Sequence, residues 1–90
     1  MEQSKVTKIR MNSFHSYSTS VTEISSLYYE GSYHSKAEAY DRVKLYPNSL
    51  CVNISTYPVL LPGISSNGEK YVHSKPDYTG KDNLLNLPRE

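Results

Sequence analysis

Residues 35–45, SKAEAYDRVKL, hold the strongest local signal in this 90-residue sequence. Ser35 and Glu38 have the spacing of a capping box, in which the serine hydroxyl accepts from the Glu38 amide and the carboxylate reaches back to the Ser35 amide. The apolar face of this helix would consist of Ala39, Tyr40 and Val43. We therefore predict one helix, Lys36 to about Leu45, that ends before Pro47 and carries a Glu38–Arg42 ion pair.

Four strands are predicted around this helix. Two precede it, at Lys5–Met11 and Val21–Tyr29, and two follow it, at Leu50–Thr56 and Lys70–Ser74. Alternation of apolar and charged residues supports the first strand, although Val6 falls on the wrong face. The apolar spacing of the second also fits a helix, but its Thr, Ser and Tyr content favours a strand.

The remaining segments predict how these elements connect. Two prolines interrupt Tyr57–Ile64, which we expect to be an apolar loop rather than a regular strand. Asn67-Gly68 predicts a tight turn, and the three leucines of residues 82–88 predict a tail that packs back onto the fold. The expected fold class is α+β: one domain over residues 1–90, with a small antiparallel sheet, one helix (β-β-α-β-β) and a docked C-terminal tail.

Composition narrows the function classes. The net charge of +1 and the pI of about 7.8 argue against a strongly basic nucleic-acid binder. Cys51 is the only cysteine, so no intrachain disulfide can form, and its apolar strand context predicts a buried, inert thiol. The polar N-terminus has no stretch typical of a signal peptide or membrane span. We expect a cytoplasmic protein with no membrane partner.

Motifs for catalysis, metal binding and cofactor binding are absent from the sequence. The three histidines lack metal-ligand spacing, and the four glycines are isolated rather than grouped in a phosphate-binding loop. No serine lies in the strand–turn–helix context of a hydrolase nucleophile. We therefore expect no catalytic residue, no metal site and no cofactor, and a protein that is not an enzyme.

The first candidate surface is the strand and its extension at residues 70–78, where basic and aromatic residues alternate. Such a pattern can stack a ring and hold a phosphate or other anion. A solvated edge strand, with lysine preventing aggregation, is the alternative interpretation. The candidate ligand-binding residues are Tyr71, His73, Lys75 and Tyr78, joined by Arg10 from the neighbouring strand.

The second candidate surface is the proline-flanked loop 57–64. An exposed apolar loop indicates a contact with another subunit or partner, whereas a loop folded onto its own core would have no such role. The candidate interface residues are Tyr57, Val59, Leu60 and Leu61.

Residues 68–77, GEKYVHSKPD, and 82–88, DNLLNLP, resemble a bacterial and phage family of small proteins known as domain of unknown function 3892. In that family a Gly-Glu-Tyr-Leu-Arg-Ser-x-Pro-Asp strand leads to an Asp-Asn-Leu-x-x-Leu-Pro tail. Residues 6–12 and 34–39 are similar to its opening strand and its Leu-Ser-Lys-Glu-Glu-Ala segment. The resemblance implies a shared fold and a bacterial or phage setting, and it supplies no established activity.

Two departures from the family pattern bear on function. His73 stands where the family has arginine, which weakens an anion-binding role for that position, and residues 12–20 and 57–64 are longer. Our leading hypothesis is a non-enzymatic, homo-oligomeric binding protein. Its partner would be an anionic, nucleotide-like signalling molecule that it sequesters, or a host defence protein that it blocks. The alternative is a nucleic-acid-binding or regulatory domain.

Overall fold

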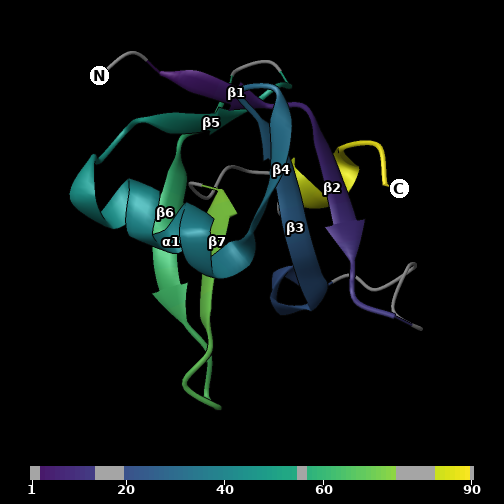
Figure 1. Cartoon of the computed structure of the whole chain (residues 1–90), viewed down its shortest axis with the longest axis vertical. Helices are drawn as coiled ribbons and strands as arrows, with labels where there is room; N and C mark the ends of the chain where they lie inside the picture. Colours follow the sequence, from purple (N-terminus) through teal and green to yellow (C-terminus); the bar gives the residue numbers. More distant parts are fainter. Residues whose placement is uncertain (1–2, 14–19, 55–56, 75–82, 90) are drawn as a thin grey trace.

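A computed structural model describes residues 3–13, 20–54, 57–74 and 83–89 (Figure 1). Helix α1 spans Lys36–Leu45, as predicted, and the Ser35 hydroxyl accepts a 3.1 Å hydrogen bond from the Glu38 amide. The predicted Glu38–Arg42 pair is wrong. Arg42 instead forms a two-pronged ion pair with Glu30, while the Glu38 carboxylate lies beside the His34 ring.

The predicted first strand is two strands that change partner at Thr7. Strand β1 (Ser4–Val6) pairs in parallel with β5 (Leu50–Val52), and β2 (Lys8–Met11) pairs antiparallel with β3 (Ile24–Tyr29). Because the alternation restarts at this change, Val6 and Ile9 both point inward and are fully buried. The apparent misplacement of Val6 in the sequence pattern follows from this change of partner.

Three small sheets surround one core. Strand β4 (Ser32–Ser35) adds to β3 as the third strand of the β2–β3–β4 sheet, and β6 (Leu60–Ile64) pairs antiparallel with β7 (Lys70–Ser74). A single bridge from Cys51 to Val59 joins β5 to the segment before β6. The α+β class is confirmed, and among the described strands every pair except β1–β5 is antiparallel.

Two sequence-based boundaries need correction. Val21–Glu23 form a short 3-10 helix, η1, so only Ile24–Tyr29 is strand. The segment predicted as an apolar loop contains β6, in which Pro62 pairs with Val72. Among the described residues β6 has β7 as its one strand partner, and proline is tolerated in such an edge strand. The predicted turn is present: the Gly68 amide donates to the Ser65 carbonyl and Gly68 has φ of +84°.

The core lies between α1 and the inner faces of the sheets, and the C-terminal tail closes it (Figure 1). The tail's short 3-10 helix, η2 (Asn83–Asn86), contributes Leu84 and Leu85, and Leu87 follows; all three are buried, as predicted. Cys51 is also fully buried, which raises the pKa of its thiol. Among the described residues, no helix has the length and apolar content needed to cross a membrane.

Candidate functional site

The predicted ligand-binding residues on β7 lie on its outer face. The rings of Tyr71 and His73 are 6.0 Å apart, while Val72 and Ser74 between and after them point into the core. The Tyr71 ring packs directly over Gly63, where an added Cβ would lie 2.7 Å from the ring. Lys75 and Tyr78, the other two candidates on this segment, lie outside the described residues.

Arg10 does not join this pair through a neighbouring strand. It lies on β2, which pairs with β3, whereas β7 pairs with β6. The prediction assumed a single sheet in which the first and last strands are neighbours. That arrangement is absent from the structure: β3 pairs with β2, the C-terminal tail forms a bridge from Arg89 to Ile9 on β2, and β7 pairs with β6.

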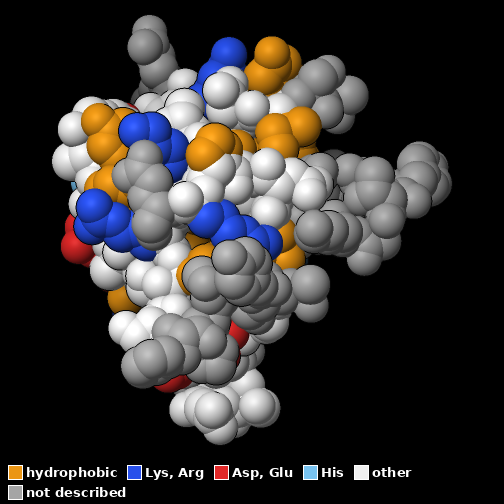
Figure 2. Space-filling model, turned by 90° about the vertical axis from the view of Figure 1, so that its right-hand side faces the viewer, with side chains coloured by type: hydrophobic (Ala, Val, Ile, Leu, Met, Phe, Trp, Pro, Cys, Tyr) orange, Lys and Arg blue, Asp and Glu red, His pale blue; other side chains and the backbone are white. Residues whose placement is uncertain are grey.

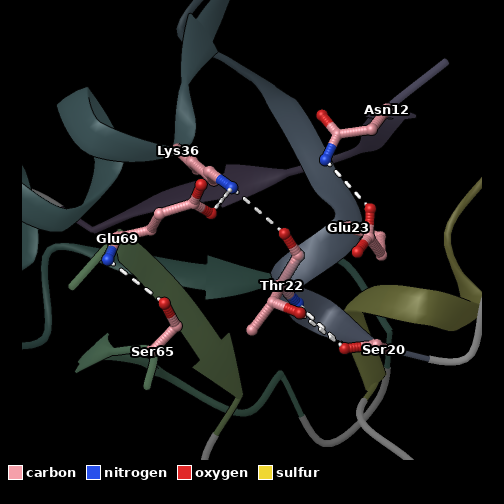
Figure 3. Close-up of polar contacts among 7 residues, drawn as sticks. All are labelled: Asn12, Ser20, Thr22, Glu23, Lys36, Ser65 and Glu69. Carbon is pink, nitrogen blue, oxygen red and sulfur yellow. Dashed lines mark hydrogen bonds and ion pairs between the residues drawn. The ribbon is translucent and has the colours of Figure 1, made fainter. Parts of the chain in front are cut away.

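Tyr71 instead lines an open polar pocket of about 520 Å³ between η1 and the β6–β7 turn. Its walls are formed by Asn12, Thr22, Glu23, Ile64, Ser65, Ser66, Asn67, Glu69 and Tyr71. Figure 3 shows how the polar groups are held: the Asn12 amide donates to the Glu23 carboxylate at 3.1 Å, and Lys36 donates to Glu69 at 3.0 Å and to the Thr22 carbonyl at 3.1 Å.

The charge of this pocket disfavours an anion. Among the described residues, its lining contains two carboxylates, from Glu23 and Glu69, and neither lysine nor arginine. The ammonium of Lys36 pairs with Glu69 from outside the lining, so it compensates one carboxylate rather than presenting a positive charge to a ligand. A nucleotide phosphate placed here would be repelled.

A second surface, along the outer side of β1 and β2, carries positive charge. Three cations there each lie over a tyrosine ring, with centroid distances of 4.5, 5.1 and 3.8 Å in chain order. We call these six residues the cation–tyrosine row: Lys5 with Tyr57, Lys8 with Tyr28, and Arg10 with Tyr33. Figure 2 views the β2 side of the molecule, where Lys and Arg side chains interleave with hydrophobic ones.

Strand register builds two of the three pairs. Lys8 lies directly opposite Tyr28, and Tyr28 lies directly opposite Tyr33 on β4. The two tyrosine rings meet edge to face at 5.0 Å, so they form a continuous aromatic surface beneath Lys8 and Arg10. Leu27 occupies the opposite face of β3 and is fully buried, which fixes the tyrosine face outward.

Sequence reasoning named only Arg10 and Tyr57 from this row, and assigned Tyr57 to an interface. The alternation of Lys8, Ile9 and Arg10 does predict two outward cations, but the tyrosines beneath them depend on strand register, which no local signal gave. The four predicted interface residues differ in their exposure to solvent. Tyr57 is 46% exposed and Val59 and Leu61 are partly buried, whereas Leu60 is 1% exposed and belongs to the core, which removes its side chain from any contact surface.

The row brings positive charge and aromatic rings together on one surface. Its charged groups are cations that contact aromatic rings, an arrangement suited to holding an anion beside a flat ring. Across the described ranges, no group of three or more His, Cys, Asp or Glu residues has the geometry to hold a metal ion.

Comparison with known proteins gives one match. A family model described as "Protein of unknown function (DUF3892)" matches residues 5–88, nearly the whole chain. Neither a curated protein nor a solved structure matches.

Proposed function

The chain belongs to this family of proteins of unknown function, and we propose that it is a non-enzymatic binding protein that holds a nucleotide-like anion on the cation–tyrosine row. One observation carries the proposal. Each of the three cations on the outer side of β1 and β2 lies over a tyrosine ring, rather than extending alone into solvent.

The tyrosine rings restrict the motion of these cationic side chains before a ligand binds. A cation over an exposed aromatic face gains about 0.5–1 kcal/mol, so its long side chain loses part of its freedom before any ligand arrives. Ordering that is already present in the free protein does not have to be supplied on binding. A phosphate that reaches Lys8 or Arg10 would form a charge-assisted hydrogen bond, which is stronger than a neutral one.

Arg10 gives the row a ring-binding element as well as a charge. Its guanidinium carbon lies 3.8 Å from the Tyr33 ring centroid, the shortest of the three cation–ring distances. A guanidinium is planar and its outer face can stack against a base while its edges donate to phosphate. This combination favours a nucleotide-like ligand over a simple inorganic anion.

The biological setting is part of the proposal. The protein would act in the cytoplasm of a bacterium or a phage-infected cell, either by sequestering a host signalling nucleotide or by blocking a host defence protein. We also propose a homo-oligomer that uses Val59 and Leu61, which are partly exposed, while Tyr57 of the predicted interface belongs to the row. Light scattering on the purified protein would report a mass that is a multiple of 10.2 kDa if this is correct.

The test of the ligand class is titration with a nucleotide panel, followed by calorimetry or NMR. We expect at least one nucleotide to bind the wild type, and the Lys8→Gln/Arg10→Gln double variant to lose at least about 100-fold in affinity, since each charged hydrogen bond contributes about 1.5–3 kcal/mol. Glutamine keeps much of the side-chain length and removes the charge.

Lys44→Gln is the matched control, because Lys44 is an exposed cation of α1 outside the row. It should bind like the wild type. Failure of every nucleotide to bind the wild type, or an equal loss in Lys44→Gln, would contradict the proposed site.

A further inference from the structure

We infer that the cation–tyrosine row takes a single-stranded nucleic acid, laid in extended form along β1 and β2, rather than a mononucleotide alone. The inference rests on the proposed function and names the ligand class of the same site. RNA and DNA strands share the chemistry that matters here, a repeating phosphate and unpaired bases.

The first argument is that the three cations lie on one continuous stretch of backbone and all point away from the core. In an uninterrupted strand Lys5 would point opposite to Lys8 and Arg10, because side chains alternate. The change of partner at Thr7 resets the alternation, so the inward positions are Val6 and Ile9. All three cations therefore face outward on one continuous stretch of backbone.

The second argument is the length of the row. A strand rises about 3.3 Å per residue, so Lys8 and Arg10 are about 7 Å apart along the chain and Lys5 and Arg10 are up to about 17 Å apart. One phosphate cannot engage positions at both ends. A chain of phosphates can, and the Lys8–Arg10 interval is close to the repeat of an extended single strand.

The third argument is the stacked surface that the rings and their cations form together, in which a base would stack on the guanidinium of the exposed Arg10 rather than on the ring beneath it. Tyr28 and Tyr33 lie edge to face beneath Lys8 and Arg10, on the outer face of the β2–β3–β4 sheet. Proteins that bind single strands combine a positive track with aromatic residues on an open sheet or groove, because unpaired bases expose faces that can stack. A duplex hides those faces, so the row favours a single strand.

The small number of cations determines how strongly the binding affinity should depend on salt concentration. Three phosphate contacts on a single strand give a slope of about −2 for the logarithm of affinity against the logarithm of salt concentration, at about 0.7 per contact. This modest dependence agrees with a net charge of only +1, which provides little long-range attraction beyond the row.

The experiment is fluorescence anisotropy with labelled oligothymidylate and oligouridylate of two, four and eight nucleotides, beside thymidine and uridine monophosphate as competitors. We expect affinity to rise from the monophosphate to about four nucleotides and then to level off. The four-nucleotide ligands should show the salt slope of about −2.

Lys5→Gln tests the linear arrangement, because Lys5 lies at one end of the row. It should weaken binding of the four-nucleotide ligands about three- to tenfold and reduce the salt slope by about 0.7, a larger loss than it causes for the monophosphates. Lys5→Arg should restore binding, and Lys44→Gln should change neither ligand.

The possible failures separate the two proposals. Monophosphates that bind as tightly as every oligonucleotide would overturn this inference and leave the proposed function standing, as would tighter binding to a duplex of the same length. An equal loss of both ligands in Lys5→Gln would also overturn it. No binding of any nucleotide would remove both proposals.

Discussion

The cation–tyrosine row and the pocket beside Tyr71 are both polar surfaces built around tyrosine, yet they carry opposite charge. In the row, cations rest over the ring faces. In the pocket, the Tyr71 ring packs over a glycine, and the charges in the lining are carboxylates. The net charge of +1 conceals this division. Topology, rather than composition, decides which kind of ligand each surface can accept.

The two surfaces also differ in how far apart their residues lie in the sequence. The three cations of the row come from a single six-residue stretch, and neighbouring strands supply two of the three rings. The pocket brings together residues from near position 12, positions 22–23 and positions 64–71. The row therefore depends on the change of partner at Thr7 and on the β2–β3–β4 register, whereas the pocket depends on the docking of the β6–β7 hairpin against η1.

Among the substitutions that distinguish the two surfaces, Gly63→Ala should cause the largest loss of stability. The new Cβ would lie 2.7 Å from the Tyr71 ring, so the ring must move from its position over β6. We expect a loss of about 1–2 kcal/mol in the free energy of unfolding, typical of overpacking. Urea denaturation would measure the loss.

Nucleotide binding at the row should remain within twofold in the Gly63→Ala variant, because Gly63 lies on β6, which pairs with β7 and not with β1 or β2. A large fall in nucleotide affinity with unchanged stability would show that the binding site includes Tyr71, as the sequence first suggested. Tyr71→Phe serves as the control that keeps the ring over Gly63 and removes only its hydroxyl.

A smaller effect concerns the ion pair that ties the β3–β4 turn to α1. The Arg42 guanidinium donates to both oxygens of Glu30, and Ser4 donates to it at 2.6 Å, which together lower the Glu30 pKa to about 2. Because this pKa lies below the ordinary value of 4.5, the unfolded state binds the proton more readily. The stabilisation is present above about pH 4.5 and is lost as pH falls toward 2.

Glu30→Gln should therefore cost about 1 kcal/mol at pH 7, the discounted contribution of a half-exposed carboxylate. Near pH 2 the difference from the wild type should vanish. Urea unfolding of both proteins across this range measures it, and the comparison cancels the contribution of the other carboxylates. A difference that persists unchanged at pH 2 would show that the pair acts through packing rather than charge.

The smallest effect should come from Glu23→Gln in the pocket. The Asn12 amide can still donate to the remaining side-chain oxygen, so stability should change by less than about 0.5 kcal/mol. Row affinity for nucleotides should stay within twofold if the surfaces act separately. An increase well beyond twofold would mean that the anion approaches the pocket after all.

Local sequence signals were sufficient to predict part of this fold. The Ser35 cap defined the start of α1, the Asn67-Gly68 turn defined the β6–β7 hairpin, and the leucines of the tail predicted their own burial. Each of these signals acts over a few residues. The ion-pair partner of Arg42 was not predicted, because this partner, Glu30, lies twelve residues away on the β3–β4 turn.

The candidate site was harder to predict because it depends on which strands are neighbours. Arg10 was correctly recognised as an outward cation, but β7 was assumed to lie beside it, so Tyr71 and His73 were grouped with it. Tyr28 and Tyr33 become its neighbours only through the β2–β3–β4 register. Leu60 was assigned to an apolar loop because the prolines of residues 57–64 disfavour a regular strand. It lies instead in β6, where its side chain is buried.

The C-terminal tail does more than fill the core, because it also covers the outer edge of β2. The Ile9 amide donates to the Pro88 carbonyl at 2.9 Å, and Ile9 and Arg89 form a parallel bridge. An uncovered strand edge offers unpaired amides and carbonyls to a second chain. Removal of the chain from Pro88 onward, which keeps the buried leucines, would thus free an edge of the strand that carries Lys8 and Arg10, and a second copy of the chain could pair with that edge.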